Sequence, residues 1–368
     1  MEHGIPVLQG KNITNDTFRW FDVRFISHRK AEELKRSSVR VGDILVVKIG
    51  SIGYSAVIQD TQGFDFAIIP ANLAKITPNG ELVDTKYLHK WLTSPEAKQY
   101  LESAASKTAQ PALSLGKIKM LPVPLPPLSE QRRIAAILDK ADELRAKRCA
   151  IVAKLNTLIQ SLFLDLFGHP DHNPKGFARK ALGELCERVT VGYVGPMAEQ
   201  YVESGIPLLR SLNVRRGHIK LADLKFVRPA FHAKLSKSAI RAGDVVTVRT
   251  GQPGTTAVVP GSLGEANCAD LIVMTCGPSL DPHYLSEALN LWLGDAESIR
   301  GQVGAIQQHF NIGRAKELEL ILPPLTLQQE FVRRLAVVDK LKAAHRTSLS
   351  EMDALFASLQ SRAFRGEL

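Results

Sequence analysis

One stretch of this sequence occurs twice: Arg40-Val-Gly-Asp-Ile-Leu-Val-Val-Lys-Ile-Gly50 is repeated as Arg241-Ala-Gly-Asp-Val-Val-Thr-Val-Arg-Thr-Gly251. A second pair, Gly4-Ile-Pro-Val-Leu8 and Gly205-Ile-Pro-Leu-Leu209, is separated by the same 201 residues. Farther along, the separation becomes 197 residues and stays so toward the end of the chain. Matches that persist in two registers through both halves of a 368-residue chain indicate a gene duplication.

Each copy has a first part that we expect to form β-strands and a second part that we expect to be helical. Short β-type runs between Gly/Pro turns predict strands at 41–49, 56–59, 245–250 and 271–275. A proline pair then precedes each helical part, and Ser129 is placed to cap the first one.

The first helical part has an apolar seam with alternating spacings of three and four residues, and the second part aligns with it without a gap. The residues that we expect to pair the helices along this seam are Ile134, Leu144, Ile151, Leu155, Leu158, Leu162, Val338, Leu341, Met352, Leu355 and Leu359. A helix with one apolar face needs a partner, so we expect the two helices, each roughly 55–60 Å long, to pair antiparallel. Arg148 would then lie near His345, where polar groups set the register; solvation of both side chains is the alternative.

These features predict an α+β fold in which two tandem mixed α/β domains are separated by two long antiparallel coiled-coil helices with pseudo-twofold symmetry. We expect the first domain at 1–127, the first spacer helix at 128–167, a linker at 168–176, the second domain at 177–322 and the second spacer helix at 323–368. The linker contains His169, Asp171 and His172, which we expect to be solvated rather than to bind a metal.

Composition excludes several classes of protein. With 45% hydrophobic and 23% charged residues, the chain is typical of a globular protein. We find no run of about 18 apolar residues and no signal-peptide core, so we expect neither a membrane span nor secretion. The four cysteines lack disulfide or zinc spacing, which favours a reduced, cytoplasmic location. The net charge of +10 permits a polyanionic partner.

Basic residues gather at equivalent places in the two copies. Nine Lys/Arg and one acid, Asp223, lie between Arg210 and Arg241, and seven Lys/Arg and three acids lie between Arg19 and Arg40. Each copy also has a Gly-x-x-Gly loop after a strand that ends in a cation, and the loops differ at Ser51-Ile52 and Gln252-Pro253. Two such modules suit phosphate contacts and the reading of two different DNA half-sites. A solvated basic face and ordinary hairpin turns are the alternatives.

The sequence contains no recognisable reaction centre. It has neither the Gly-x-x-x-x-Gly-Lys-Ser/Thr loop of ATPases nor a Gly-x-Gly-x-x-Gly motif, and Asn173-Pro-Lys-Gly-Phe177 lacks the second proline of an amino-methyltransferase signature. Glu33-Leu-Lys35 with Asp22 has a spacing seen in nucleases, but such matches are common by chance. We therefore expect a binding protein with no catalytic or metal-binding residues, rather than a stand-alone nuclease or methyltransferase.

Several strings resemble the specificity subunits of type I restriction–modification systems. They are Leu121-Pro-Val-Pro-Leu-Pro-Pro-Leu-Ser-Glu-Gln-Arg-Arg-Ile134, the linker from Phe167-Gly168 to Asn173-Pro-Lys-Gly176 with Leu182-Gly-Glu184 after it, Leu322-Pro-Pro-Leu325, and the terminal Arg362-Ala-Phe-Arg-Gly-Glu-Leu368. The resemblance covers essentially the whole chain. It implies two target-recognition domains that each read half of a gapped double-stranded DNA site, and two helices that set the gap.

The resemblance also implies partners. Two methyltransferase subunits and the restriction subunits would dock on this chain and would hold S-adenosylmethionine, ATP and Mg, so this chain itself would bind no cofactor. The residues that we expect near DNA are Arg24, Arg29, Lys30, Lys48, Ser51, Tyr54, Arg210, Asn213, Arg215, Arg216, Arg249, Thr250, Gln252 and Thr255. Gln110 and Gln307 match a repeated family glutamine that either braces the fold or touches DNA.

The first copy departs from the family pattern at its start. Residues 177–204 precede Gly205 in copy two, whereas only Met1 to His3 precede Gly4 in copy one. We expect this difference to leave a sheet edge exposed in the first domain. An orphan DNA-binding or scaffold protein with a defective first recognition domain is therefore the alternative to a working specificity subunit.

Overall fold

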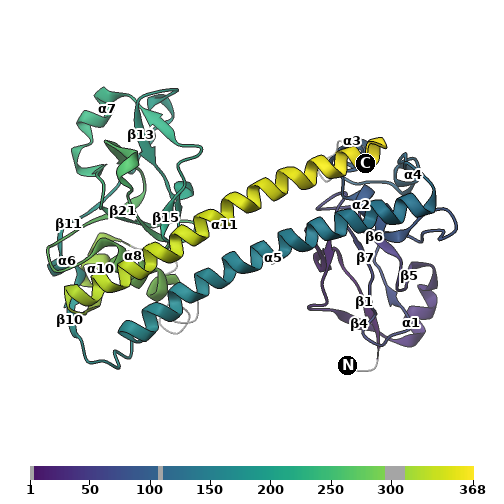
Figure 1. The fold of residues 1–368 in the computed structure, drawn as a ribbon, viewed down its shortest axis with the longest axis horizontal. Helices are drawn as coiled ribbons and strands as arrows, with labels where there is room; N and C mark the ends of the chain where they lie inside the picture. Colours follow the sequence, from purple (N-terminus) through teal and green to yellow (C-terminus); the bar gives the residue numbers. More distant parts are fainter. Residues whose placement is uncertain (1–3, 107–110, 295–310) are drawn as a thin grey trace. The chain divides into compact units, whose positions relative to one another are not determined.

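The computed structural model describes residues 4–106, 111–294 and 311–368. The chain divides into two compact units, which are treated separately below: unit 1 contains residues 1–150 and 346–368, and unit 2 contains residues 151–345. Two long helices, α5 (Leu128–Phe167) and α11 (Leu325–Arg365), each contribute to both units (Figure 1). Each unit therefore combines one set of strands with a segment from each long helix, so the compact units cut across the two sequence copies.

Unit 1 contains two small sheets and a hairpin. The first sheet has the order β4-β1-β8-β5, built from Arg24–Ile26, Ile5–Val7, Ala67–Ile68 and Ser38–Val39. The second has the order β7-β6-β9, built from Ser55–Val57, Ile44–Val47 and Leu73–Ile76, and the hairpin joins β2 (Ile13–Thr14) to β3 (Thr17–Phe18). The helices of this unit besides the long ones are α1 (His28–Glu33), α2 (Thr85–Leu92), α3 (Pro95–Ala104) and α4 (Leu115–Lys119).

Unit 2 repeats this arrangement with additional strands. Its first sheet has the order β12-β16-β13-β20-β17, from Tyr201–Val202, Lys225–Val227, Ile206–Leu209, Ala266–Cys268 and Ala239–Ile240. Its second has the order β11-β21-β18-β19, from Cys186–Val191, Leu271–Cys276, Val245–Val248 and Thr256–Val258. It also has the hairpin β14–β15 (Val214–Arg215, His218–Ile219), the pair β10–β22 (Ala178–Ala181, Glu319–Leu322), and helices α6 (Leu182–Leu185), α7 (Pro229–Lys234), α8 (Pro282–Gly294) and α10 (Ile312–Glu317).

The two units show the duplication in three dimensions. Strand β6 pairs with β7 and β9 in unit 1 just as β18 pairs with β19 and β21 in unit 2, and β1 lies between β4 and β8 just as β13 lies between β16 and β20. The additional strands β10, β11 and β12 all come from residues 178–202, the segment that precedes the repeat in copy two only. Within the described part of unit 1, β9 is accordingly an edge strand, whereas its equivalent β21 is covered by β11.

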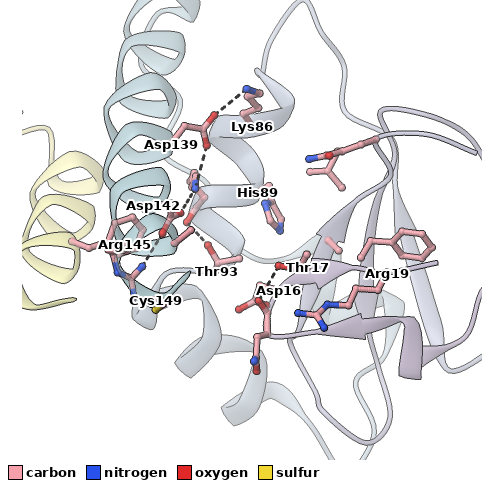
Figure 2. Close-up of a pocket in the computed structure, with 18 of the residues that line it drawn as sticks. Asp16, Thr17, Arg19, Lys86, His89, Thr93, Asp139, Asp142, Arg145 and Cys149 are labelled. Atoms are coloured by element: carbon pink, nitrogen blue, oxygen red, sulfur yellow. Dashed lines mark hydrogen bonds and ion pairs between the residues drawn. The ribbon is translucent and has the colours of Figure 1, made fainter. Parts of the chain in front are cut away.

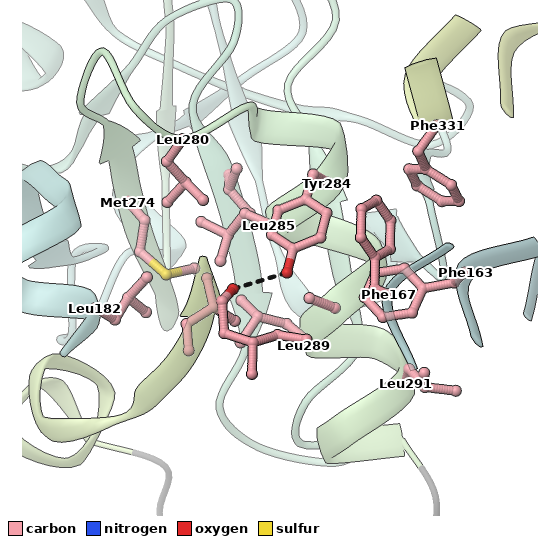
Figure 3. Close-up of a cluster of buried hydrophobic side chains, with 14 of the residues drawn as sticks. Phe163, Phe167, Leu182, Met274, Leu280, Tyr284, Leu285, Leu289, Leu291 and Phe331 are labelled. Carbon is pink, nitrogen blue, oxygen red and sulfur yellow. Dashed lines mark hydrogen bonds between the residues drawn. The ribbon is translucent and has the colours of Figure 1, made fainter. Parts of the chain in front are cut away.

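Each unit packs its strands and helices on antiparallel segments of the two long helices. In unit 1, Ile134 and Leu138 of α5 share a core with Phe364 of α11. In unit 2, Phe163 and Phe167 of α5 share a core with the early α11 residues Phe331, Leu335 and Val338 (Figure 3). The Phe163 ring is 5.6 Å from that of Tyr284 and 5.5 Å from that of Phe331, centroid to centroid, in an aromatic cluster that fixes helix to domain.

The predicted seam is buried at some positions and exposed at others. Ile134 and Val338 are buried, at 2% and 7% exposure. Positions toward the middle of the helices are open, including Leu144, Ile151, Leu158, Leu341 and Leu355. The predicted seam is thus only partly buried: Leu158 and Leu355 are exposed although their neighbours Ile159 and Phe356 pack in the unit cores.

Helix α5 also bears on the membrane question. It contains a window of mean hydropathy 1.4 and is the one helix among the described residues that is long and apolar enough to cross a membrane by length and composition alone. Core helices of globular domains pass the same test, and the α5 side chains of Ile159, Phe163 and Phe167 belong to the core of unit 2. These three side chains are therefore inside the fold, although only 17% of the apolar window is buried.

One buried glutamine near the start of each long helix forms hydrogen bonds to two other segments. These are the loop directly before the long helix and the loop before α2 in unit 1 or before α8 in unit 2. Gln131 accepts a hydrogen bond from the Asp84 backbone N–H (2.9 Å) and donates to the carbonyl oxygens of Leu82 (3.0 Å) and Pro126 (2.8 Å). In unit 2, Gln328 accepts from the Asp281 N–H (2.8 Å) and donates to two carbonyl oxygens, at 3.1 and 2.9 Å. The same polar clasp thus appears at both helix starts.

Candidate nucleic-acid interface

The two Gly-x-x-Gly loops join equivalent strand pairs. Gly50 and Gly53 have φ values of 95° and 82°, and Gly251 and Gly254 have 86° and 88°, all in the left-handed region that favours glycine. Gly254 also sits so close to α8 that a Cβ there would lie 2.6 Å from the Leu293 Cβ. These glycines hold the loops in one shape while the residues between them differ.

The side chains at the loops are held to different degrees. Ser51, Thr250 and Gln252 are exposed, whereas Lys48, Tyr54, Arg249 and Thr255 are half-buried. Arg249 donates to the Asp270 carboxylate (3.1 Å), which also accepts from the Thr250 hydroxyl (2.5 Å). In unit 1, the Lys98 ammonium lies 5.0 Å from the centre of the Tyr54 ring. Ser51 and Gln252 are therefore the loop side chains best placed to meet another molecule.

The predicted basic residues are mostly on the surface. Arg24 is in β4, and Arg29 and Lys30 are in α1, where Lys30 forms an exposed ion pair with Glu33 (2.7 Å). Arg215 is exposed on the β14–β15 hairpin, and Arg210, which is half-buried, donates to the Asp223 carbonyl oxygen (3.1 Å).

Asn213, which also belongs to the predicted set, is only 2% exposed. Its side-chain oxygen accepts from the Arg210 N–H (3.1 Å), and its amide donates to the Lys220 carbonyl oxygen (3.3 Å). Asn12 braces the same turn in unit 1, where its amide donates to the Arg19 and Phe21 carbonyl oxygens (3.2 and 2.8 Å). This repeated asparagine therefore shapes the turn before the hairpin in both units.

Arg216 faces the inside of unit 2 as well as solvent. Its guanidinium lies 3.0 Å from the Gln160 side-chain oxygen once that amide is oriented to accept. It is also one of two cations, with Lys342, that pull down the pKa of Glu287, although burial raises that pKa more strongly. Arg216 thus connects the hairpin to α5 and α8, a structural role that competes with contact to DNA.

A groove of about 1010 Å³ lies in unit 1 between the β2–β3 hairpin, α2 and the two long helices (Figure 2). Lys86 and Lys90 of α2 bridge to Asp139 of α5 (2.9 and 3.2 Å), and Lys90 also pairs with Asp142. Arg145 donates to Asp142 and to Asp353 of α11, both at 2.7 Å. The network joins three helices.

His89 lies on the same wall of the groove (Figure 2). Its Nε2 is 3.1 Å from the Ser55 carbonyl oxygen. Burial lowers the pKa of this imidazole, an effect that the Ser55 carbonyl partly opposes. The ring is therefore held neutral at pH 7 and donates one N–H to the neighbouring strand.

The sequence analysis did not identify this groove. Its charged residues are spread over α2, α5 and α11, and their alternation along each helix is ordinary for a solvated face. One feature of the sequence could have drawn attention to the charged network of this groove. Asp142 and Asp339 are acids at equivalent positions of the duplication. Gln110 and Gln307 lie outside the described residues, and no group of metal-binding side chains occurs within residues 4–106, 111–294 and 311–368.

Comparison with known proteins shows what this chain is similar to. A family model described as the type I restriction modification DNA specificity domain matches residues 2–155. The EcoBI specificity subunit of Escherichia coli is 29% identical over 171 residues, covering 45% of this chain and 35% of that protein. A putative MjaX specificity subunit of Methanocaldococcus jannaschii is 20% identical over 99% of this chain and 87% of its own. Residues 2–155 thus match the specificity-domain family, and the chain as a whole is similar to type I restriction–modification specificity subunits.

Solved structures agree with this specificity-subunit fold along the full length. A chain from a structure titled "Structural basis underlying complex assembly and conformational transition of the type I R-M system" has a TM-score of 0.59 and 19% identity, and covers 99% of this chain and 92% of that one. A type I S subunit from M. genitalium gives 0.54 and 14% over 99% and 90%. At these identities they support the fold, including the two domains and paired long helices, rather than an activity.

Proposed function

We propose that this chain is the DNA-recognition subunit of a type I restriction–modification complex and that it reads a two-part, gapped site. Each unit would read one half-site, and the long helices would set the gap. The chain would perform no chemistry itself. Methyl transfer from S-adenosylmethionine and ATP-dependent cleavage, with Mg, would belong to two methyltransferase subunits and the restriction subunits that dock on it in the cytoplasm.

One observation carries the proposal: two equivalent strand–turn–strand frames present different exposed polar residues at one position. The β6–β7 frame presents Ser51, and the β18–β19 frame presents Gln252 at the equivalent place. A serine hydroxyl bonds to several bases, whereas a glutamine amide can form a bidentate pair with adenine. A shared frame with different tips is what reading two different half-sites requires.

Surface cations supply the second support. Arg24 and Arg29 are exposed on β4 and α1 of unit 1, and Arg215 is exposed on the β14–β15 hairpin of unit 2, which contacts β18 and β19. Contacts from such residues to phosphates position a protein on the duplex without specifying sequence. Their removal should therefore weaken binding to all sequences.

The test is to co-express the chain with a type I methyltransferase subunit and to map methylated positions across a genome. We expect a gapped, two-part motif. Gln252→Ala should relax one half of the motif and Ser51→Ala the other, while Arg215→Ala should lower methylation everywhere without changing the motif. Gln329→Ala, at an exposed position on α11, is the control.

Two results would contradict the proposal. Loss of both halves in Gln252→Ala would show that reading is not modular. Absence of methylation, with the same methyltransferase active beside another specificity subunit, would favour an orphan scaffold with a defective first domain.

A further inference from the structure

Equivalent positions in the two copies carry opposite charges where each domain meets the long helices. Lys90 lies in α2 and Glu287 in α8, and the two are separated by the 197 residues of the duplication. Their neighbours Tyr87 and Tyr284 are also equivalent, are fully buried, and donate to the carbonyl oxygens of Pro124 (2.9 Å) and Ile321 (2.8 Å). The backbone register is thus the same, and only the sign of the side chain differs.

In unit 1 the position faces carboxylates. The Lys90 side chain is 12% exposed and pairs with Asp142 and with Asp139, the latter at 3.2 Å, both on α5 (Figure 2). Gln360 of α11 donates to the Lys90 carbonyl oxygen (2.9 Å), so both long helices hold this residue. A carboxylate here would meet two others in a partly desolvated place.

In unit 2 the position lies near two cations and one acid. Glu287 is 8% exposed, and a Cβ at Gly217 of the neighbouring hairpin would lie 2.9 Å from its Oε1. The charged groups that act on it are Arg216 of the hairpin and Lys342 and Asp339 of α11. Lys342 is itself only 7% exposed and pairs with Asp339 at 3.2 Å. A lysine in place of Glu287 would be buried beside two cations.

The helix segments beside these two positions also differ in charge, and the segment beside the lysine is the more acidic one. Asp139 of α5 corresponds to Ala336 of α11, and Arg145 corresponds to Lys342, while Asp142 and Asp339 are shared. Unit 1 therefore offers one more acid than unit 2 at this contact. The change on the domain and the change on the helix compensate each other within each unit.

We propose that this charge inversion matches each recognition domain to its own segments of the spacer helices and disfavours the other domain there. Lys90 and Glu287 are the residues that make the distinction. The duplication leaves the two docking surfaces otherwise alike, with the same buried tyrosine and the same glutamine clasp. Apolar packing alone would not distinguish two such similar surfaces. The opposite charges do distinguish them, because placing a domain on the other helix segments would bring like charges together in a poorly solvated contact, which is strongly unfavourable.

The proposal is tested in the full chain by placing in each copy the residue of the other. Lys90→Glu and Glu287→Lys are each compared with neutral Lys90→Gln and Glu287→Gln, and hydrogen exchange is followed in β6 for unit 1 and β18 for unit 2. We expect Lys90→Glu to raise the opening constant of unit 1 at least tenfold above that of Lys90→Gln, and Glu287→Lys to do the same in unit 2.

A neutralised background distinguishes charge from packing. The stability that Lys90→Glu removes from unit 1 should return when Asp139→Asn and Asp142→Asn are also present. The stability that Glu287→Lys removes from unit 2 should likewise return when Lys342→Gln is present. Each combination is compared with the neutralising substitutions alone. If Lys90→Glu unfolds unit 1 completely, this recovery decides the question. Equal effects of the inverted and neutral variants, or no recovery in the neutral background, would overturn the proposal. Neither readout involves DNA, so the result is independent of the proposed function.

Discussion

Replacing either clasp glutamine by methionine removes three hydrogen bonds at the start of a long helix. Gln131 and Gln328 are 1% and 0% exposed, so water cannot take over the bonds. At about 1 kcal/mol net for each bond, the loss is about 3 kcal/mol, and the stranded N–H and carbonyl groups add to it. Methionine fills a similar volume, so the cavity contribution is small.

The duplication makes this a replicated measurement. The bonds of Gln131 span 2.8–3.0 Å and those of Gln328 span 2.8–3.1 Å, so we expect equal costs in the two units. Native-state hydrogen exchange is the suitable assay, because it reports β6 and β18 separately where a single unfolding midpoint would mix the two units.

Gln329→Met, one residue along α11 and exposed, is the control and should change stability by less than about 0.5 kcal/mol. A loss below about 1 kcal/mol in both units would refute the assignment of the clasp. Losses that differ between units by more than about 2 kcal/mol would refute the energetic equivalence of the two copies.

Two further predictions follow from buried side chains. Phe163→Ala should destabilise unit 2 by about 4 kcal/mol, because it empties the centre of the aromatic cluster; the exposed neighbour Leu164→Ala should cost much less in the same exchange experiment, and similar losses would contradict the packing. His89 has a lowered pKa, so the folded state binds fewer protons than the unfolded state, and unit 1 should lose stability as the pH falls below the ordinary value of 6.5. His89→Gln should reduce the loss of unfolding free energy between pH 7 and pH 5, measured by urea unfolding at each pH. If the unfolding free energy depends on pH as strongly in this variant as before, another group is responsible.

Sequence reasoning predicted most of the fold because the duplication supplied its own alignment. The repeated Asp-hydrophobic runs predicted β6 and β18, and the seam predicted two long helices, which the structure has at Leu128–Phe167 and Leu325–Arg365. The sequence could not show that each compact unit draws on both copies. The sequence predicted an antiparallel pair of helices, but it placed the boundaries between domain and helix rather than within the helices, where the compact units divide.

The candidate site was less predictable, because the type of a polar residue near a loop does not show whether its side chain faces solvent or the interior. Asn213 and Gln252 both lie near basic stretches, yet one is buried in a turn and the other is exposed. The Lys90 and Glu287 inversion was visible in the alignment at 197 residues, but its meaning required the neighbours on α5 and α11. Burial, rather than residue type, separates the structural polar groups from those that can bind DNA.

Different cations donate to equivalent backbone carbonyl oxygens in the two units. In unit 2, Arg188 of β11 donates to the Ala239 carbonyl oxygen (3.1 Å) and to Asp244, which also accepts from Thr275 (2.6 Å). In unit 1, which lacks an equivalent of β11 among its described strands, Lys75 of β9 donates to the Ser38 carbonyl oxygen (2.7 Å), at the position equivalent to Ala239.

The Asp43 carboxylate is likewise kept, since it accepts from Thr77 (2.6 Å) as Asp244 does from Thr275. A lysine on an edge strand also opposes pairing with another chain, because the approaching strand would have to desolvate its charge. Lys75 therefore pairs within the fold and also protects the β9 edge, among the described strands of unit 1, from pairing with another chain.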